Sequence, residues 1–213
     1  MPTQTASPPS YFSGPIEKFA DTLPSVHDLF RARWSPRAFS DRDVSNADLE
    51  TIFEAARWAA SSFNEQPWRF LVARKSDPAA YDKILNVLLP FNRAWAQSAP
   101  VLFIMAAKRT FSHSGAENLY GVHDAGQALA HAFLQATALG LHAHGMAGFD
   151  RDRARSELGI PDDYDLGAAV ALGYLGSPEQ LPDQHRQSEL APRTRKPLNE
   201  IVFGAEFGQP LQL

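Results

Sequence analysis

The sequence contains no cysteine. This absence excludes disulfide bonds, a thiolate nucleophile and cysteine-ligated metal sites. No apolar run approaches the roughly 20 residues of a membrane-spanning helix, and the longest run, 101–107, matches one buried strand. The net charge is −4, from 20 basic and 24 acidic residues. The sequence therefore gives no electrostatic reason to expect binding to nucleic acid or to an anionic membrane.

Several common site motifs are also missing. The sequence has no G-x-G-x-x-G loop, no P-loop and no G-x-S-x-G elbow, so a nicotinamide would not dock in a Rossmann fold of its own. His142 and His144 lie two residues apart without an evident third ligand, and we expect no metal site. Residues 1–24 lack the basic start and apolar stretch of a secretory signal. We expect a loosely ordered leader there and a cytoplasmic protein.

The 213 residues, 44% hydrophobic and 21% charged, suffice for one globular domain with a sizeable core. Periodicity and caps predict helices over about 25–33, 45–60, 77–88, 119–139 and 150–159, and strands over 70–73, 101–107 and 168–175. Because helices and strands do not alternate regularly, the pattern favours an α+β fold. The first helix would start with a capping box, Ser25 to Asp28, and bury Phe30.

The chain divides into a leader (1–24), a body (25–175) and a C-terminal arm (176–213). The arm contains five prolines, little periodicity and one late apolar triplet, 201–203. A long structureless tail is improbable on a compact monomer. We therefore expect the arm to lie across a partner subunit and add a strand to its sheet.

A first polar constellation is Arg33, Ser35 and Arg37. Pro36 favours extended backbone before it, and alternate side chains of an extended segment point the same way. Guanidinium groups and a hydroxyl that converge in this manner suit a phosphate. The alternative is a solvated basic turn.

A second constellation is Ser61, Ser62, Asn64 and Gln66, between an amphipathic helix and a strand. Such mixed donors and acceptors suit a flat heterocycle with ring carbonyls and N–H groups. The alternative is an ordinary polar loop built from turn residues.

The order and spacing of these segments, with Arg193-Thr194-Arg195 near the C-terminus, resemble the nitroreductase family over about 25–203. That family is FMN-dependent and forms intimate homodimers. The resemblance implies a central mixed, mostly antiparallel sheet flanked by helices, with the C-terminal tail adding a strand to the partner subunit's sheet and FMN sites at the subunit interface.

The resemblance also implies roles for individual residues. The contacts to the ribityl chain and phosphate would come from Arg33, Trp34, Ser35, Arg193 and Arg195. Arg37 would be a catalytic group near the N1/C2 side of the flavin, where a cation stabilises negative charge. Asn92 would hydrogen-bond the pyrimidine edge.

Two loops would complete the site. The loop that reaches the flavin in the other subunit would contribute Ser61, Ser62, Asn64 and Gln66. The loop over the central ring would be Gly145, Met146, Ala147 and Gly148. The backbone N–H of Ala147 would lie near flavin N5 as the second catalytic group. Some members carry Glu at this position, and Ala keeps the N–H but not the charge.

The implied activity is ping-pong hydride transfer through flavin N5, from NADH or NADPH to a nitroaromatic, quinone or similar electron-poor small molecule. One alternative is other chemistry on the same fold, such as dehalogenation, ring oxidation or flavin breakdown. Others are a flavin-binding protein without turnover and an α+β interaction domain without a cofactor.

Overall fold

The computed structural model describes residues 15, 16 and 18–212. Within them a single sheet contains β1 (Trp68–Arg74), β2 (Val101–Lys108), β3 (His142–Met146) and β4 (Tyr164–Gly173). The strand order is β1-β2-β4-β3, and each neighbouring pair is antiparallel. The expected α+β fold with a mostly antiparallel sheet flanked by helices is confirmed.

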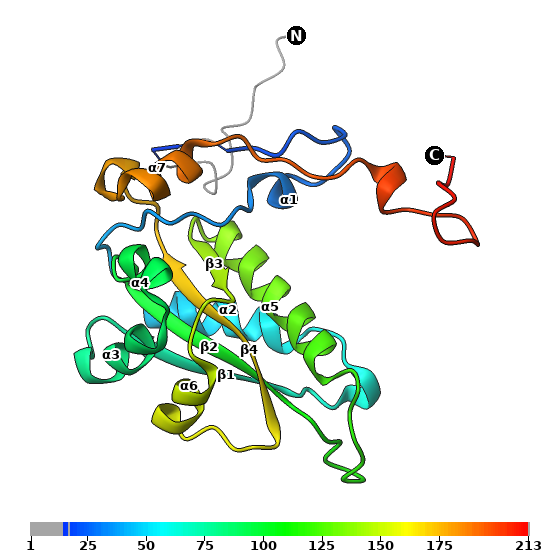
Figure 1. The fold of residues 1–213 in the computed structure, drawn as a ribbon, viewed down its shortest axis with the longest axis horizontal. Coiled ribbons are helices and arrows are strands. Elements are labelled where there is room, and N and C mark those ends of the chain that lie inside the picture. The colour runs from blue at the N-terminus through cyan, green and yellow to red at the C-terminus, as the bar shows by residue number, and fades with distance from the viewer. Residues whose placement is uncertain (1–14, 17, 213) are drawn as a thin grey trace.

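Helices cover both faces of this sheet (Figure 1). One face carries α3 (Pro78–Val87), α4 (Pro90–Ala96) and α6 (Arg151–Leu158), and the other carries α2 (Asn46–Arg57) and α5 (Gly121–Ala138). The central strand β2 is buried almost throughout because it serves both layers. Leu102 and Ile104 face the first layer, whereas Val101 and Phe103 face the second. This is the two-residue alternation of a strand.

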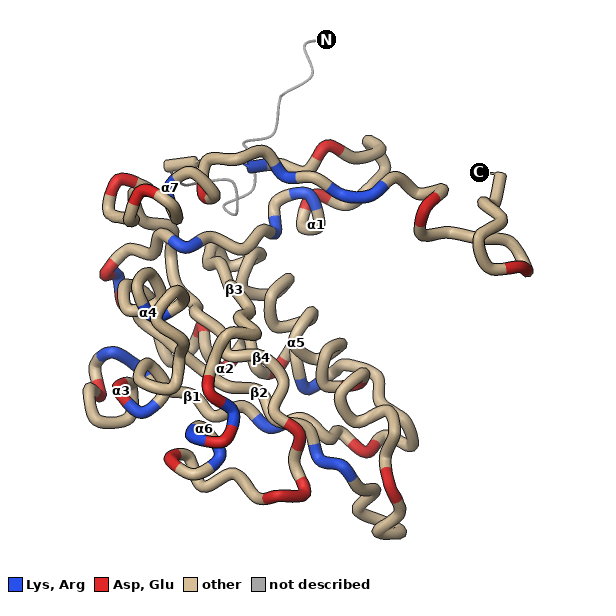
Figure 2. The backbone as a smooth tube through the Cα atoms, in the orientation of Figure 1, with Lys and Arg blue, Asp and Glu red and all other residues tan. Residues whose placement is uncertain are grey.

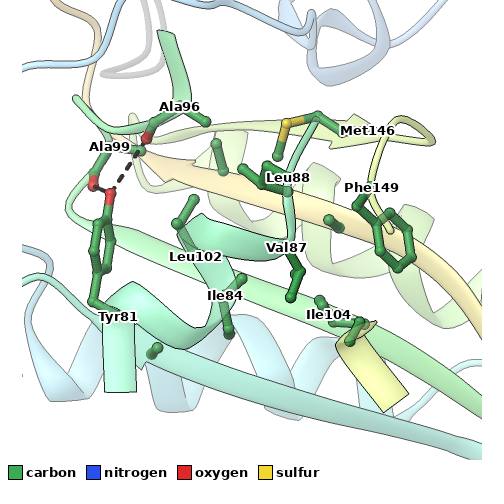
Figure 3. Close-up of a cluster of buried hydrophobic side chains, with 14 of the residues drawn as sticks. Tyr81, Ile84, Val87, Leu88, Ala96, Ala99, Leu102, Ile104, Met146 and Phe149 are labelled. Carbon is green, nitrogen blue, oxygen red and sulfur yellow. Dashed lines mark hydrogen bonds between the residues drawn. The ribbon is translucent and has the colours of Figure 1, made fainter. Parts of the chain in front are cut away.

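Figure 3 shows the core under the first layer, where α3 packs on β2. Burying a large apolar side chain such as Ile84 or Leu102 stabilises the fold by about 1.5–3 kcal/mol. The one phenol in this core is satisfied, because the Tyr81 hydroxyl donates to the Ala99 carbonyl at 2.6 Å. Burial raises the pKa of Tyr81.

Several predicted helix boundaries are confirmed by their caps. Ser45 and Asp77 accept from backbone N–H groups at the starts of α2 and α3, and Asp150 does so at α6. Gly159 ends α6 in the left-handed conformation with φ of 63°, which glycine adopts without strain. The N-terminal part of the predicted fourth helix, Leu119 and Tyr120, lies outside α5.

The first helix differs from its prediction. α1 spans only Asp28–Ala32, and its N-cap is His27, whose ring nitrogen accepts from the Leu29 N–H. The predicted capping box is wrong, because Asp28 instead pairs with Arg31 at 3.0 Å. Phe30 was expected to be buried but is 56% exposed.

The ends of the chain were only partly predicted. Most of the leader, 1–14 and 17, lies outside the described residues. Residues 176–190 pack on the body of their own chain through η3 (Pro178–Gln180) and α7 (Asp183–Leu190), a helix that the sequence pattern did not predict. Beyond it the arm runs alongside α1 and then away from the body through η4 (Leu198–Glu200) (Figure 1). Among the described residues, no helix has the length and apolar character to cross a bilayer.

Candidate functional site

The segment that links α1 to the sheet is extended and alternates in burial. Ala32, Trp34, Pro36 and Ala38 are buried, and the side chains between them are partly exposed. The segment joins the end of β4 through a bridge between Phe39 and Leu175. The predicted alternation is therefore present, and it turns Arg33, Ser35 and Arg37 away from the core.

Arg33 lies in a basic pocket between α1 and the arm. The pocket has a volume of about 220 Å³ and is lined by Ala20, Asp21, Thr22, Phe30, Arg33, Arg193, Thr194 and Arg195. Basic stretches lie side by side on α1 and the overlying arm (Figure 2). Burial and the neighbouring Arg195 lower the pKa of Arg33, and burial together with Arg33 and Arg195 lowers that of Arg193. Cations that crowd in this way favour an anion between them. The structure thus brings together three of the predicted phosphate residues.

Ser35 and Trp34 are neighbours of Arg33 in the chain but do not line this pocket. The guanidinium of Arg33 donates to the Ser35 hydroxyl at 3.4 Å. Trp34 is buried, and its ring meets His142 edge to face at 6.0 Å between centroids. Trp34 therefore supports the segment from beneath.

Arg37 occupies a different environment from Arg33. Its backbone N–H and that of Ala38 donate to the carboxylate of Glu189 on α7, at 2.9–3.1 Å. Glu189 is 1% exposed, and burial raises its pKa although these hydrogen bonds oppose the shift. The side-chain Nε of Arg37 is buried without a hydrogen-bond partner in the described part of the chain. Such a donor is free for a ligand acceptor.

Two histidines of β3, the buried His142 and the half-buried His144, support the same segment. His144 Nδ1–H donates to the Pro36 carbonyl at 2.8 Å, and its ring packs on Trp95 at 4.6 Å. Burial lowers the pKa values of His142 and His144 to about 4, so both are neutral at pH 7. No group of three or more metal-ligating side chains occurs in the described residues.

The loop after β3 is tied to α4. The Asn92 amide donates to the Gly148 carbonyl at 3.0 Å, and a Cβ on Gly148 would lie 2.7 Å from the same amide nitrogen. A side chain at position 148 would therefore displace the Asn92 amide from this hydrogen bond. Ala147 and Gly145 are exposed, whereas the Met146 side chain is buried in the core. Only the backbone of Met146 can face a ligand.

The Ser61–Gln66 loop is held in a strained conformation. Phe63, Asn64 and Gln66 have φ values of 52–54°, a left-handed region that costs a non-glycine residue energy and occurs preferentially at functional sites. The Ser62 N–H donates to the buried carboxylate of Asp124 on α5 at 2.8 Å. The Ser61 hydroxyl accepts from the Gln66 N–H at 3.0 Å.

This loop and α1, which lies beside the basic pocket, are at opposite ends of the sheet (Figure 1). The loop precedes the start of β1, which pairs through Ala107 with Asp165 near the start of β4. The segment that carries Arg33 is bridged through Phe39 to Leu175, just beyond the end of β4. β4 has ten residues, so at about 3.3 Å per residue its ends are about 30 Å apart. One chain does not bring the two predicted halves together.

Several residues that position these segments were missed. Glu189, Asp124 and His144 each hold the backbone of a predicted motif from another element. Their partners are 62 to 152 residues away along the chain, so no local spacing could reveal them. The leader residues of the pocket were missed for the same reason.

Comparison with known proteins identifies the chain's relatives. The Nitroreductase family profile matches residues 30–174. A crystal structure of an oxidoreductase containing FMN superposes with a TM-score of 0.83 at 37% identity, over 90% of this chain and 96% of that one. The NADH dehydrogenase of Thermus thermophilus is 30% identical over 80% of this chain and 91% of its own length. The major NAD(P)H-flavin oxidoreductase of Aliivibrio fischeri is 33% identical over 43% of this chain and 42% of its own.

The matched region contains the segment of Arg33 to Arg37, the Ser61–Gln66 loop and the loop after β3, which are three of the segments that the resemblance predicts around one cofactor. The chain belongs to the nitroreductase family, whose solved members include FMN-containing proteins.

Proposed function

We propose that the protein is an FMN-dependent NAD(P)H oxidoreductase that reduces nitroaromatic, quinone or similar electron-poor acceptors in alternating half-reactions. The observation that carries this proposal is the basic pocket, because three guanidinium groups crowd there without a carboxylate bonded to any of them in the described residues. Asp21 is the one acidic residue of the lining, and a phosphate would bring further negative charge to the three guanidinium groups. When bound, FMN supplies the redox chemistry, taking hydride at N5 and passing electrons to the acceptor.

The chain's own residues would bind and orient the cofactor. Arg33 and Arg195 would hold the phosphate, with Ser35 beside them. The unpartnered Nε of Arg37 would donate to the pyrimidine side of the ring. The exposed backbone at Gly145 and Ala147 would pass over the central ring, and Asn92 would fix that loop through Gly148.

We further propose that the protein is a homodimer, with each FMN site completed by the partner's Ser61–Gln66 loop. The two halves of the site are separated by the length of the sheet within one chain. Large apolar side chains near the loop are exposed, including Phe63 at 82%, Leu119 at 80% and Trp58 at 74%. Exposed apolar surface of this kind marks an interface.

The arm would complete the dimer. Ile201 and Phe207 are exposed on their own chain, and β1 pairs only with β2 among the described strands, so one edge of β1 is free. A pocket of about 490 Å³ lies between this edge and α3, lined by apolar residues together with Asp77 and Lys83. Addition of the partner's arm at this edge would cover the exposed apolar residues of the arm and the apolar residues of this pocket. The domain boundaries 1–24, 25–175 and 176–213 and the cytoplasmic location stay predictions.

The cofactor assignment is tested by the absorption spectrum of the purified protein and the mass of the released chromophore. About one FMN per chain supports the proposal. Anaerobic reduction by NADH or NADPH and reoxidation by a quinone or nitroarene then tests turnover. Arg195→Ala should weaken FMN binding, and the adjacent Lys196→Ala is the matched control, because Lys196 does not line the pocket. Failure to bind FMN would refute the proposal.

Mixing two variants tests the shared site. One variant carries Arg33→Ala and Arg195→Ala, and the other carries Asn64→Ala and Gln66→Ala. Heterodimers formed by refolding the two together would contain one site with both halves intact, so FMN binding should return. Absence of any recovery, with heterodimers demonstrated by mass, would refute the shared site.

A further inference from the structure

The basic pocket has a wall that lies outside the family-matched region. Of its lining residues, Phe30 and Arg33 fall within residues 30–174, whereas Ala20, Asp21 and Thr22 belong to the leader and 193–195 to the arm. The leader therefore runs across the side of the pocket that the family match does not describe. The three predicted motifs within residues 30–174 do not include this wall.

The leader is fixed to the body by its backbone and by one side chain. The Ala20 N–H donates to the Arg31 carbonyl at 3.0 Å. The Lys18 ammonium donates to the Glu189 carbonyl and lies 4.8 Å from the centroid of the Trp34 ring. A cation over an aromatic face is attracted to it. These contacts hold residues on both sides of position 19.

Arg193 connects the leader to the rest of the pocket. Its Nη1 donates to the carbonyls of Lys18 at 2.8 Å and Arg31 at 2.6 Å, and its Nη2 donates to that of Arg33 at 2.8 Å. One guanidinium from the arm thus joins the leader, α1 and the segment that follows α1. These donors are engaged with backbone carbonyls. Arg193 therefore holds the walls of the pocket in place as well as adding positive charge to it. Arg33 and Arg195 are left as the more available cations.

We propose that the leader segment 18–22 is a strap across the basic pocket that retains the phosphate monoester of the bound cofactor, with Lys18 and Arg193 as its positioning residues. The inference rests on the proposed function, because the ligand is the phosphate of FMN. Release of the cofactor then requires the strap to open. Riboflavin has the same ring without the phosphate, so its binding does not depend on the strap.

The test compares two N-terminal deletions in the otherwise complete protein. Deletion of residues 1–22 removes the strap, whereas deletion of 1–14 leaves residues 18–22 in place and is the matched control. The measurements are the release rates and the dissociation constants of FMN and of riboflavin. We expect the 1–22 deletion to accelerate FMN release about tenfold, the factor that one or two ordinary hydrogen bonds are worth. The 1–14 deletion should behave as the intact chain.

A point variant provides the same test without a deletion. Ala20→Pro removes the N–H that donates to Arg31, and Ala20→Ser keeps it. FMN release should be faster in Ala20→Pro than in Ala20→Ser. The circular dichroism spectrum must remain that of the intact chain. If the 1–22 deletion does not fold, the pair of point variants decides.

The outcomes separate this proposal from the proposed function. If the intact chain binds FMN and neither the deletion nor Ala20→Pro changes its release, the strap is overturned and the function stands. Equal acceleration of FMN and riboflavin release would indicate general loosening and would also overturn it. If the intact chain binds no flavin, the proposed function fails and the strap, which requires that cofactor, fails with it.

Discussion

The carboxylate of Glu189 offers the sharpest test of how this site is built. Replacing Glu189 by Ala removes the acceptor of two backbone N–H groups, those of Arg37 and Ala38, which it receives at 2.9–3.1 Å. Ala38 is 1% exposed. No other acceptor for these N–H groups is found among the described residues.

The expected cost follows from the two lost acceptors. Leaving a buried donor unsatisfied costs about 1–3 kcal/mol, and the two together would cost about 2–6 kcal/mol. Burial of the carboxylate offsets part of this, as the raised pKa of Glu189 indicates. We therefore expect Glu189→Ala to lower the free energy of unfolding by about 3 kcal/mol. For a chain of this size the melting temperature would fall by about 6–12 °C.

The assay is urea and thermal unfolding at one fixed protein concentration, because oligomerisation makes stability concentration-dependent. Glu189→Gln keeps one oxygen acceptor and should lose about half as much. Glu50→Ala, on the exposed face of α2, is the control and should change stability by less than about 0.5 kcal/mol. A Glu189→Ala protein as stable as this control would refute the reasoning that the carboxylate holds the Arg37 segment.

Three further predictions follow from other contacts. Because His142 and His144 have pKa values lowered from 6.5 to about 4, the unfolded chain binds more protons between these values. Stability should therefore fall as the pH drops from 6.5 to 4, by at most about 3 kcal/mol per histidine at about 1.4 kcal/mol per pH unit, and His142→Leu should reduce this dependence in urea titrations. Asp124→Ala removes the acceptor of the Ser62 N–H. FMN binding should weaken about tenfold, which is what one hydrogen bond to a charged group is worth. An unchanged dissociation constant of FMN would contradict the role of Asp124. Gly148→Ala should destabilise the protein by about 1–3 kcal/mol through overpacking against Asn92. If adding Asn92→Ala to the same chain does not restore the melting temperature, the contact with Asn92 is not the cause.

The sequence alone predicted those helix boundaries that depend on a few adjacent residues. Asp77 with Pro78, and Gly159, set helix boundaries because caps and left-handed turns depend on a few adjacent residues. The alternation around Pro36 likewise appears in the structure as predicted. The short helix α1 was predicted with the wrong start, because the side chain of Asp28 pairs with Arg31 and His27 takes the cap.

Sequence also predicted which residues would bind a ligand, because guanidinium, hydroxyl and amide groups in a fixed order suggest a ligand before any fold is known. The family resemblance predicted Arg33 beside Arg193 and Arg195, but it could not say that the backbone of Arg37 would lie against Glu189. That contact depends on where α7 returns to the body, some 150 residues later along the chain.

Only the tertiary structure decided the arrangement of the two predicted halves of the site. The loop around Asn64 and the pocket around Arg33 flank the same sheet, yet antiparallel pairing puts them at its opposite ends. Their separation is set by the length and register of β4, which result from many long-range contacts rather than from any single motif. The sequence by itself determined which groups could bind a phosphate and a flat heterocycle, and the register of the sheet decided that one chain does not join them.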